Sequence, residues 1–377
     1  MLLAIGILYH KKRLPVMMNK IFIFILGFEI SKKIAWISVI IILSSYVILN
    51  LNALQQQEAF VDTPAVEEGA KNWQPQLSQW VIGADLKYFF LHYSLYLFHN
   101  IRIIPFLVSM SIAILTYLIT ADVSKKRFAG IISLVSLLQS PLFFKYASTS
   151  TYENSWILFY LLSLYLIRRW YLSSPVYVLS LISKGLTAVY FPMSLFYIFR
   201  SDITKTKKIL NLSFYAIIII YVAVSFFTNN TQVSTDISFH DKEFWTGFSA
   251  PESSLKSDGL VLMSIIPVVF GLFMTTGKGI KQADSIMIVI SGILLTPPLL
   301  AGFTHIWNED YRMIPLIVFI AIGLGTIFSK NNTATVQSKK IGFVSYFVFS
   351  LTMTLSILAI TEVIFPQLVL RFYGLFL

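Results

Sequence analysis

Apolar runs of about 18 to 25 residues recur along this chain with almost no charged residue inside them, and a helix of that length can cross a bilayer. A helix also satisfies its own backbone hydrogen bonds, which lipid cannot do. Of the 377 residues, 56% are hydrophobic and only 12% are charged, whereas an average soluble domain has about twice that charged share. The sequence therefore predicts an all-α polytopic membrane protein.

One of these runs is interrupted in its middle. Residues 174–199 contain Lys184, Gly185 and Pro192, and basic residues flank the run on both sides. We expect this run to enter and return as two short helices. Counting both, the chain would have about 11 transmembrane helices. The other predicted spans lie near residues 34–53, 101–120, 128–146, 154–168, 209–228, 259–276, 283–303, 313–328 and 341–364.

Lys and Arg residues gather in the short segments between the spans. The positive-inside rule assigns these segments to the cytoplasm and predicts a cytoplasmic N-terminus and a multi-pass protein of the plasma membrane. Topology then explains the net charge of +11, so nucleic acid is not an expected partner. Cysteine is absent, which excludes thiolate catalysis. The basic segments are residues 11–13, 32–33, 125–127, 168–169, 200–208, 278–281 and 330–340.

Three regions follow from this topology: a cytoplasmic N-terminal segment (1–33), a transmembrane module (34–200) and a variable C-terminal transmembrane region (201–377). The module contains a long outer loop at 54–100, and the C-terminal region contains an outer loop at 229–258. Most acidic residues fall on this outer side. Aromatic residues recur on one helical face near the end of the first loop, which predicts a helix lying in the membrane interface.

Residues 97–170 have a recognisable order of parts. An Arg-containing span with Arg102 is followed by a basic turn, an apolar helix ending in Ser140-Pro141, a short outer segment with Glu153, and the helix "NSWILFYLLSLYLI". This order resembles the GT-C superfamily of membrane glycosyltransferases, particularly protein O-mannosyltransferases and aminoarabinose transferases. The stretch "SLISKGLTAVYFPMSLFYIF" is similar to that family's Lys-containing helix pair, with Lys184 and Pro192 in the same order.

The resemblance implies transfer of a sugar from a polyprenyl-phosphate donor to an acceptor hydroxyl, with inversion, on the non-cytoplasmic face. The acceptor hydroxyl would belong to a lipid, a glycan or a protein, and the reaction would take place in the cell envelope. This chemistry needs a base or anchor for the hydroxyl, a cation for the departing phosphate, and a groove open to membrane lipids.

Acidic residues of the first outer loop are the candidates for the base. The family's Asp-Glu or Asp-Asp pair is absent, and Glu67-Glu68 stands in its place, with Asp62 close by. Solvated loop acids are the plain alternative for all three. Glu153 either caps the helix that follows it or faces the same cavity, where it orients a substrate or holds a divalent cation such as Mg or Mn together with a loop acid.

The candidates for phosphate binding are Lys184, Arg312 and His305. Lys184 lies within an apolar run, where a charge is expensive unless it faces water or a partner; the alternative places it at the tip of a helical hairpin. Arg312 presents a planar fork that suits phosphate, or it pairs with Glu309 or Asp310. His305 alternatively anchors a helix to the lipid headgroups.

Other functions remain open at this point. A secondary transporter would usually carry charges near the bilayer midplane and internal symmetry, whereas here Lys184 is the one strong example and the halves do not match. A noncatalytic scaffold of glycan assembly, or a polymerase or ligase acting on polyprenyl-linked glycans, would share the membrane setting. The transferase hypothesis requires that the first outer loop and the segment around Glu153 meet over a shared, lipid-accessible pocket outside the cytosol.

Overall fold

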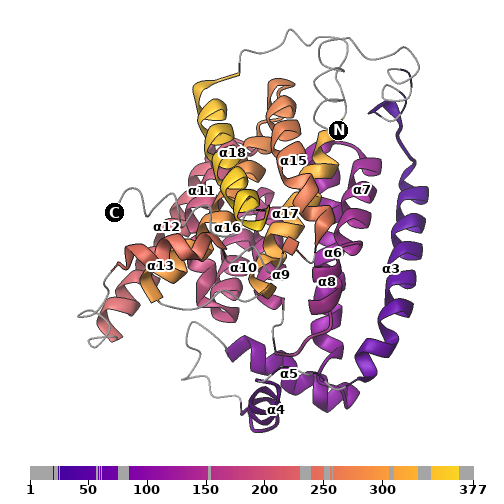
Figure 1. Cartoon of the computed structure of the whole chain (residues 1–377), viewed down its shortest axis with the longest axis vertical. Helices are drawn as coiled ribbons and strands as arrows, with labels where there is room; N and C mark the ends of the chain where they lie inside the picture. Colours follow the sequence, from indigo (N-terminus) through magenta and orange to yellow (C-terminus); the bar gives the residue numbers. More distant parts are fainter. Residues whose placement is uncertain are drawn as a thin grey trace.

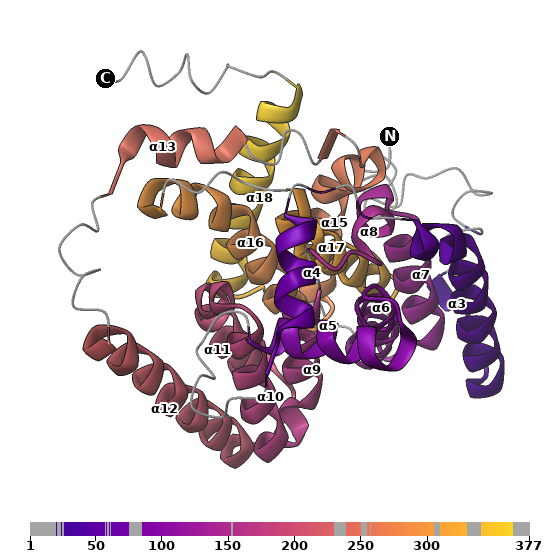
Figure 2. The ribbon, with the colours of Figure 1, turned by 90° about the horizontal axis from the view of Figure 1, so that it is seen from below.

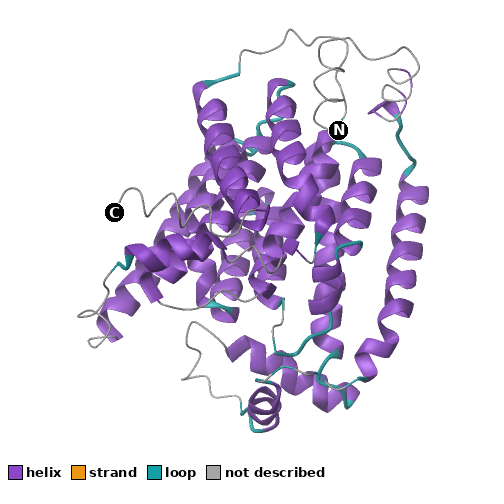
Figure 3. Ribbon diagram, in the orientation of Figure 1, coloured by secondary structure: helices purple, strands orange, loops and turns teal. Residues whose placement is uncertain are grey.

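The computed structural model forms a bundle of helices that run mostly along the long axis of the molecule (Figure 1). Every regular element in the described residues is a helix (Figure 3). The prediction of an all-α protein is therefore confirmed. The structure describes residues 20, 24, 26–56, 58, 60, 62–74, 85–151, 154–229, 239–249, 255–256, 258–304, 310–329 and 341–364.

Within the described residues, six helical segments are long and apolar enough to cross a membrane. They coincide with six of the predicted spans, and they indicate a membrane-embedded protein. The total of 11 spans and the side on which each loop lies stay predictions. The six are α3 (Lys32–Gln55), α6 (Ile103–Ser124), α15 (Gly259–Gly277), α16 (Gln282–Thr304), α17 (Ile314–Ile327) with the preceding turn η5 (Asp310–Met313), and α18 (Phe343–Ile364).

The predicted span 128–146 is two helices, α7 (Arg127–Leu138) and α8 (Pro141–Tyr146). Pro141 occupies the first turn of α8, and the Ser140 hydroxyl accepts a hydrogen bond from the Phe143 amide at 3.0 Å. A proline at this position lacks only an amide that would be unpaired anyway, so it starts a new helix. The span predicted at 154–168 is α9 (Ser155–Tyr165), which ends in the tight turn η2 (Leu166–Arg168).

The interrupted run forms two short helices, as expected. They are α10 (Trp170–Ser183) and α11 (Phe191–Arg200), joined by the 3-10 turn η3 (Gly185–Tyr190). Lys184 has an extended backbone at the break. Arg168, before α10, and Ser201, after α11, line the same small cavity. The chain therefore enters and returns at one end of the bundle, and Lys184 lies at the far point of this excursion.

Two helices of the first long loop lie across the other end of the bundle (Figure 1; seen from below in Figure 2). They are α4 (Thr63–Lys71) and α5 (Asp85–Phe98), and they pack together through a small apolar cluster that includes Val66 and Leu91. Tyr96 and Leu97 on α5 are exposed. A helix therefore forms near the end of the first loop, as predicted, and its place in the membrane interface stays a prediction.

Helix α17 is the centre of the molecule. It packs against α6, α7, α15 and α16, so it joins the two halves of the chain. Gly325 makes this possible, because a Cβ atom there would lie 2.5 Å from the backbone oxygen of Ala129 on α7. Small residues commonly allow such close approach in membranes. The helices α12 (Lys205–Asn229) and α13 (Asp241–Thr246) lie at the periphery (Figure 2), and the turn η4 (Gly247–Ser249) packs against α16 and α18.

Candidate functional site

The first outer loop folds directly onto the turn at residues 147–151. The Glu58 carboxylate accepts hydrogen bonds from the Ser150 amide at 2.9 Å and from the Ser150 hydroxyl. The hydroxyls of Thr63 and Thr151 are 3.2 Å apart, and Lys87 Nζ donates to the Thr151 carbonyl at 2.5 Å. The two segments are therefore in contact up to Thr151, and the shared lipid-accessible pocket that the transferase hypothesis also requires stays a prediction.

Arg102 fastens the same turn to the end of α3. Its Nε and Nη2 donate to the Ser148 carbonyl and hydroxyl, both at 2.8 Å. Its Nη1 donates to the Gln56 carbonyl at 2.7 Å and also to the Ala53 carbonyl. Burial lowers the pKa of Arg102, and the nearby charge of Glu58 opposes this shift. The guanidinium is thus a rigid connector between three segments.

Aromatic rings connect the first loop to the turn before α17. Phe60 stacks on Tyr146 with centroids 5.9 Å apart, and Tyr146 meets Tyr311 of η5 at 6.3 Å. Beside them Lys145 Nζ is 3.4 Å from a carboxylate oxygen of Asp310. The first loop, the turn after α8 and the turn before α17 therefore form one continuous surface of rings.

Two of the predicted phosphate ligands converge on this surface. Lys184 Nζ lies 4.3 Å from the centroid of the Tyr311 ring and 5.9 Å from that of Trp156. Arg312 Cζ lies 5.8 Å from the same Tyr311 centroid. Cations within about 6 Å of a ring are attracted to its face. The site therefore consists of two cations around one tyrosine, with Trp156 stacked on Tyr190 behind it at 5.9 Å.

These two cations lack an acidic partner in the part of the chain that the structure describes. Neither Lys184 nor Arg312 forms an ion pair there. The Nε and Nη1 atoms of Arg312 are buried and have no hydrogen-bond partner among the same residues. Asp310, one expected partner of Arg312, pairs with Lys145 instead. A buried donor without an acceptor is expensive, so this arrangement suits an anion.

The three candidate acids of the first loop, Asp62, Glu67 and Glu68, have fewer contacts with the site than the two cations have. Glu67 Oε2 is 3.9 Å from Lys71 Nζ on the same helix, and Glu68 is exposed. Asp62 is also exposed, but it precedes Thr63, which contacts the 147–151 turn. Of the three, Asp62 is the one that directly precedes a residue in contact with that turn. Their catalytic roles stay predictions.

Two predicted residues, Glu153 and His305, lie outside the described residues. Among those that are described, no group of three or more His, Cys, Asp or Glu side chains is arranged to hold a metal ion. The role of Glu153 and a Mg or Mn ion held by it therefore stay predictions.

Sequence reasoning missed Glu58, Arg102 and Tyr311 as parts of the site. The sequence analysis used Arg102 only as part of the order of elements that resembles the family. An Arg at the start of an apolar span nevertheless needs several hydrogen-bond acceptors. The hydroxyl-rich turn "STST" indicates that its amides need acceptors once they are buried, but nothing local identifies Glu58, 92 residues away, as the acceptor. Tyr311 stands beside Arg312 in the sequence, but nothing local predicts its contact with Lys184.

The fold and the site together define an all-helical, membrane-embedded protein with a two-cation, aromatic-lined centre next to the end that α4 and α5 cover. Comparison with protein-family models, with curated proteins and with solved structures finds no match to this chain.

Proposed function

We propose that this protein is a glycosyltransferase that moves a sugar from a polyprenyl-phosphate donor to an acceptor hydroxyl. The observation that carries the proposal is the pair of cations, Lys184 and Arg312, at Tyr311. Two positive charges without a described carboxylate partner suit a ligand that brings its own negative charge. A phosphate that departs from a sugar carbon is such a group.

The two cations would act on the departing phosphate in different ways. Arg312 offers a planar fork that can bind two phosphate oxygens at once, and Lys184 offers a compact charge. Both lie among buried rings, where electrostatic attraction is stronger than in water. Their interaction with the phosphate grows as the glycosidic bond breaks, which lowers the barrier to transfer.

The acceptor hydroxyl needs a base on the opposite face of the sugar. Asp62 is the best placed of the three loop acids because Thr63 already contacts the turn, and Glu153 follows that turn directly. Glu67 and Glu68 remain candidates on the same helix. Inversion at the anomeric carbon follows from a single displacement between a base and a phosphate site on opposite sides.

The membrane side is part of the proposal. The end of the bundle that carries the basic segments would face the cytoplasm, and the α4–α5 end would face outward in the plasma membrane. The donor lipid and acceptor would therefore meet at the cell envelope. The exposed apolar side chains of α5, among them Tyr93, Tyr96 and Leu97, are suited to the membrane interface.

The test uses the purified protein in bilayers with a panel of labelled polyprenyl-phosphate sugars. We expect one label to be transferred, and we expect Arg312→Gln and Lys184→Gln each to reduce the transfer rate about 100-fold or more, as loss of one such electrostatic donor does. Lys242→Gln, which removes an exposed cation of α13 that, among the described residues, makes no contact with this centre or with the candidate acids, is the matched control. Transport of an intact donor across the bilayer would favour the transporter, and no use of any donor would favour the scaffold.

A further inference from the structure

A second basic site lies at the end of the bundle opposite α4 and α5. It is a cavity of about 640 Å³ between the turn joining α6 and α7, the end of α11, the start of α12 and the turn joining α15 and α16. Both halves of the chain therefore contribute to it. The charged side chains that line it are Lys125, Arg200, Lys208, Lys278, Lys281 and one acid, Asp202.

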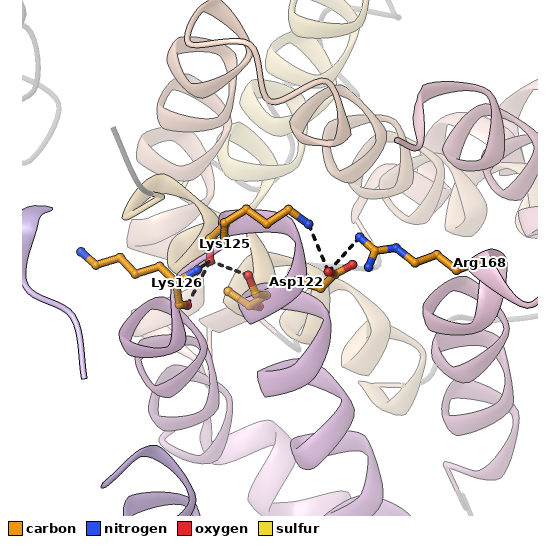
Figure 4. A network of polar contacts seen from close by, with 6 residues as sticks. Asp122, Lys125, Lys126 and Arg168 are labelled. Carbon is orange, nitrogen blue, oxygen red and sulfur yellow. Dashed lines mark hydrogen bonds and ion pairs between the residues drawn. The ribbon is translucent and has the colours of Figure 1, made fainter. Parts of the chain in front are cut away.

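Two of the five lining cations are neutralised by acids. Lys125 Nζ is 3.1 Å from Asp122, which also binds Arg168 at 3.0 Å (Figure 4). Arg200 forms an ion pair with the buried Asp284. The other three, Lys208, Lys278 and Lys281, make no ion pair with a carboxylate in the described part of the chain.

The cations are close enough to repel one another. Lys208 lies in the first turn of α12, before the apolar run 209–228. Burial and the charges of Lys281 and Arg200 lower its pKa, while Asp202 acts in the opposite direction. The Nε of Arg200 is also buried without a hydrogen-bond partner among the described residues. A bound anion would relieve the repulsion and supply the missing acceptor.

Backbone geometry helps to hold these charges together. Gly279 has a φ angle of 94°, which residues with a side chain rarely adopt. This conformation closes the turn between α15 and α16 so that Lys278 and Lys281 line the same cavity. The positive-inside rule explains basic residues at this end, but it does not require that they line a common cavity.

The surroundings of the cavity are apolar on the side of α12. Phe199, a lining residue, is 59% exposed, and Ile209, which follows Lys208, is 60% exposed. These side chains could pack against acyl chains while the lysines bind a headgroup. Basic pockets between membrane helices are known to bind anionic lipid headgroups.

We propose that this cavity binds a phosphate group, carried by an anionic lipid of the surrounding leaflet. Lys208, Lys278 and Lys281 hold the phosphate oxygens, and Phe199 and Ile209 contact the acyl chains. The site is separate from the centre at Lys184 and Arg312, and it does not depend on the proposed sugar transfer.

The test measures the melting temperature of the full-length protein in phosphatidylcholine discs, with and without phosphatidic acid. Phosphatidic acid is chosen because its headgroup is a bare phosphate. A second arm adds inorganic phosphate against chloride at equal ionic strength. The test variant is Lys208→Gln/Lys278→Gln/Lys281→Gln, and the matched control is Lys32→Gln/Lys33→Gln/Lys205→Gln, which removes three exposed lysines that do not line the cavity.

We expect phosphatidic acid to raise the melting temperature of the wild type and of the control. The test variant should bind it roughly 100-fold more weakly, since each lysine near an anionic surface contributes about fivefold. If inorganic phosphate raises the melting temperature as much as phosphatidic acid does, and the test variant loses this shift, the cavity binds phosphate, and free phosphate rather than a lipid is its source. The proposal is overturned if no shift occurs, if the test variant keeps it, or if the control loses it equally.

Folding of the test variant is checked by its melting temperature in phosphatidylcholine alone, which we expect to equal or exceed that of the wild type because like charges are removed. The single variant Lys281→Gln provides a milder change with an expected loss of about fivefold in phosphatidic acid binding. An unchanged affinity in a folded Lys281→Gln protein would also count against the site.

Discussion

The hydroxyl of Ser140 donates a hydrogen bond to a carboxylate oxygen of Asp258, 118 residues later in the chain. Each of these residues also begins a helix. Ser140 caps α8, and Asp258 caps α15 by accepting from the Val261 amide at 3.2 Å. Both side chains are fully buried. One hydrogen bond therefore fixes the starts of two helices from different halves of the chain.

Loss of this link should destabilise the fold. In Asp258→Ala, α15 loses its cap, worth about 1 kcal/mol, and Ser140 loses a bond to a charged group, worth about 1.5 to 3 kcal/mol. The measurement is thermal unfolding in detergent. Ser111→Ala, which removes an exposed hydroxyl, is the control. In a double-mutant cycle with Ser140→Ala the two effects should not add, and full additivity would contradict a direct coupling.

Asp284 should be far more sensitive to neutralisation than Asp122. Asp284 is fully buried, pairs with Arg200, and accepts from Thr276 and Ser345 hydroxyls, both at 2.8 Å. Asp284→Asn leaves a partly buried guanidinium uncompensated, which costs about 3 to 5 kcal/mol. The more exposed Asp122→Asn should cost about 1 kcal/mol or less.

The same unfolding measurement tests both variants. Adding Arg200→Gln to Asp284→Asn should restore a large part of the lost stability, because the unpaired charge is then gone. If Asp284→Asn and Asp122→Asn lowered the free energy of unfolding equally, water would screen the Arg200–Asp284 ion pair as well as it screens an exposed pair.

Glu58 should control the order of the turn at 147–151. In Glu58→Ala the Ser150 amide loses its acceptor, so hydrogen–deuterium exchange of residues 148–151 should accelerate. We expect a change of about tenfold, equivalent to about 1.4 kcal/mol. Glu68→Ala removes an exposed acid from α4 and serves as the control. Unchanged exchange in Glu58→Ala would mean that the first loop does not hold the turn.

Gly325 should tolerate no side chain. A Cβ atom there would clash with the Ala129 carbonyl on α7, so Gly325→Ala should force the helices apart at a cost of about 1 to 3 kcal/mol. Gly259→Ala is a matched control, because a Cβ atom at that position meets nothing within 4 Å. Its melting temperature should be equal to or above that of the wild type.

The sequence predicted the helices better than it predicted their contacts. Runs of apolar residues are local, so the six long helices and the break at Lys184 could be located from the chain alone. The span predicted at 128–146 runs through Ser140-Pro141, whereas the family resemblance places the end of a helix there. A proline alone does not reveal that the chain restarts as a new helix, α8, directly after it. The rotation of α4 about its axis decides which loop acid approaches the turn at 147–151, and no local sequence pattern predicts that rotation. The three acids are Asp62, Glu67 and Glu68.

The site itself could be predicted only in part. Lys184 and Arg312 were identified because charges in or beside apolar runs need a reason. Their convergence on Tyr311 joins residues more than a hundred positions apart, and it results from the packing of α10 and η5 around the bundle. Glu58 escaped notice for the same reason, since its partner Ser150 is 92 residues away.

The central place of α17 has a consequence for how the protein is made. Residues 314–327 emerge late from the ribosome, yet α6 and α7 depend on them to cover their inward faces. Until α17 has been synthesised, the faces of α6 and α7 that pack against it therefore contact lipid instead. Biogenesis of this protein is then a process in which the last third of the chain completes the first, and a nascent chain that stops short of residue 314 is a natural target for membrane quality control.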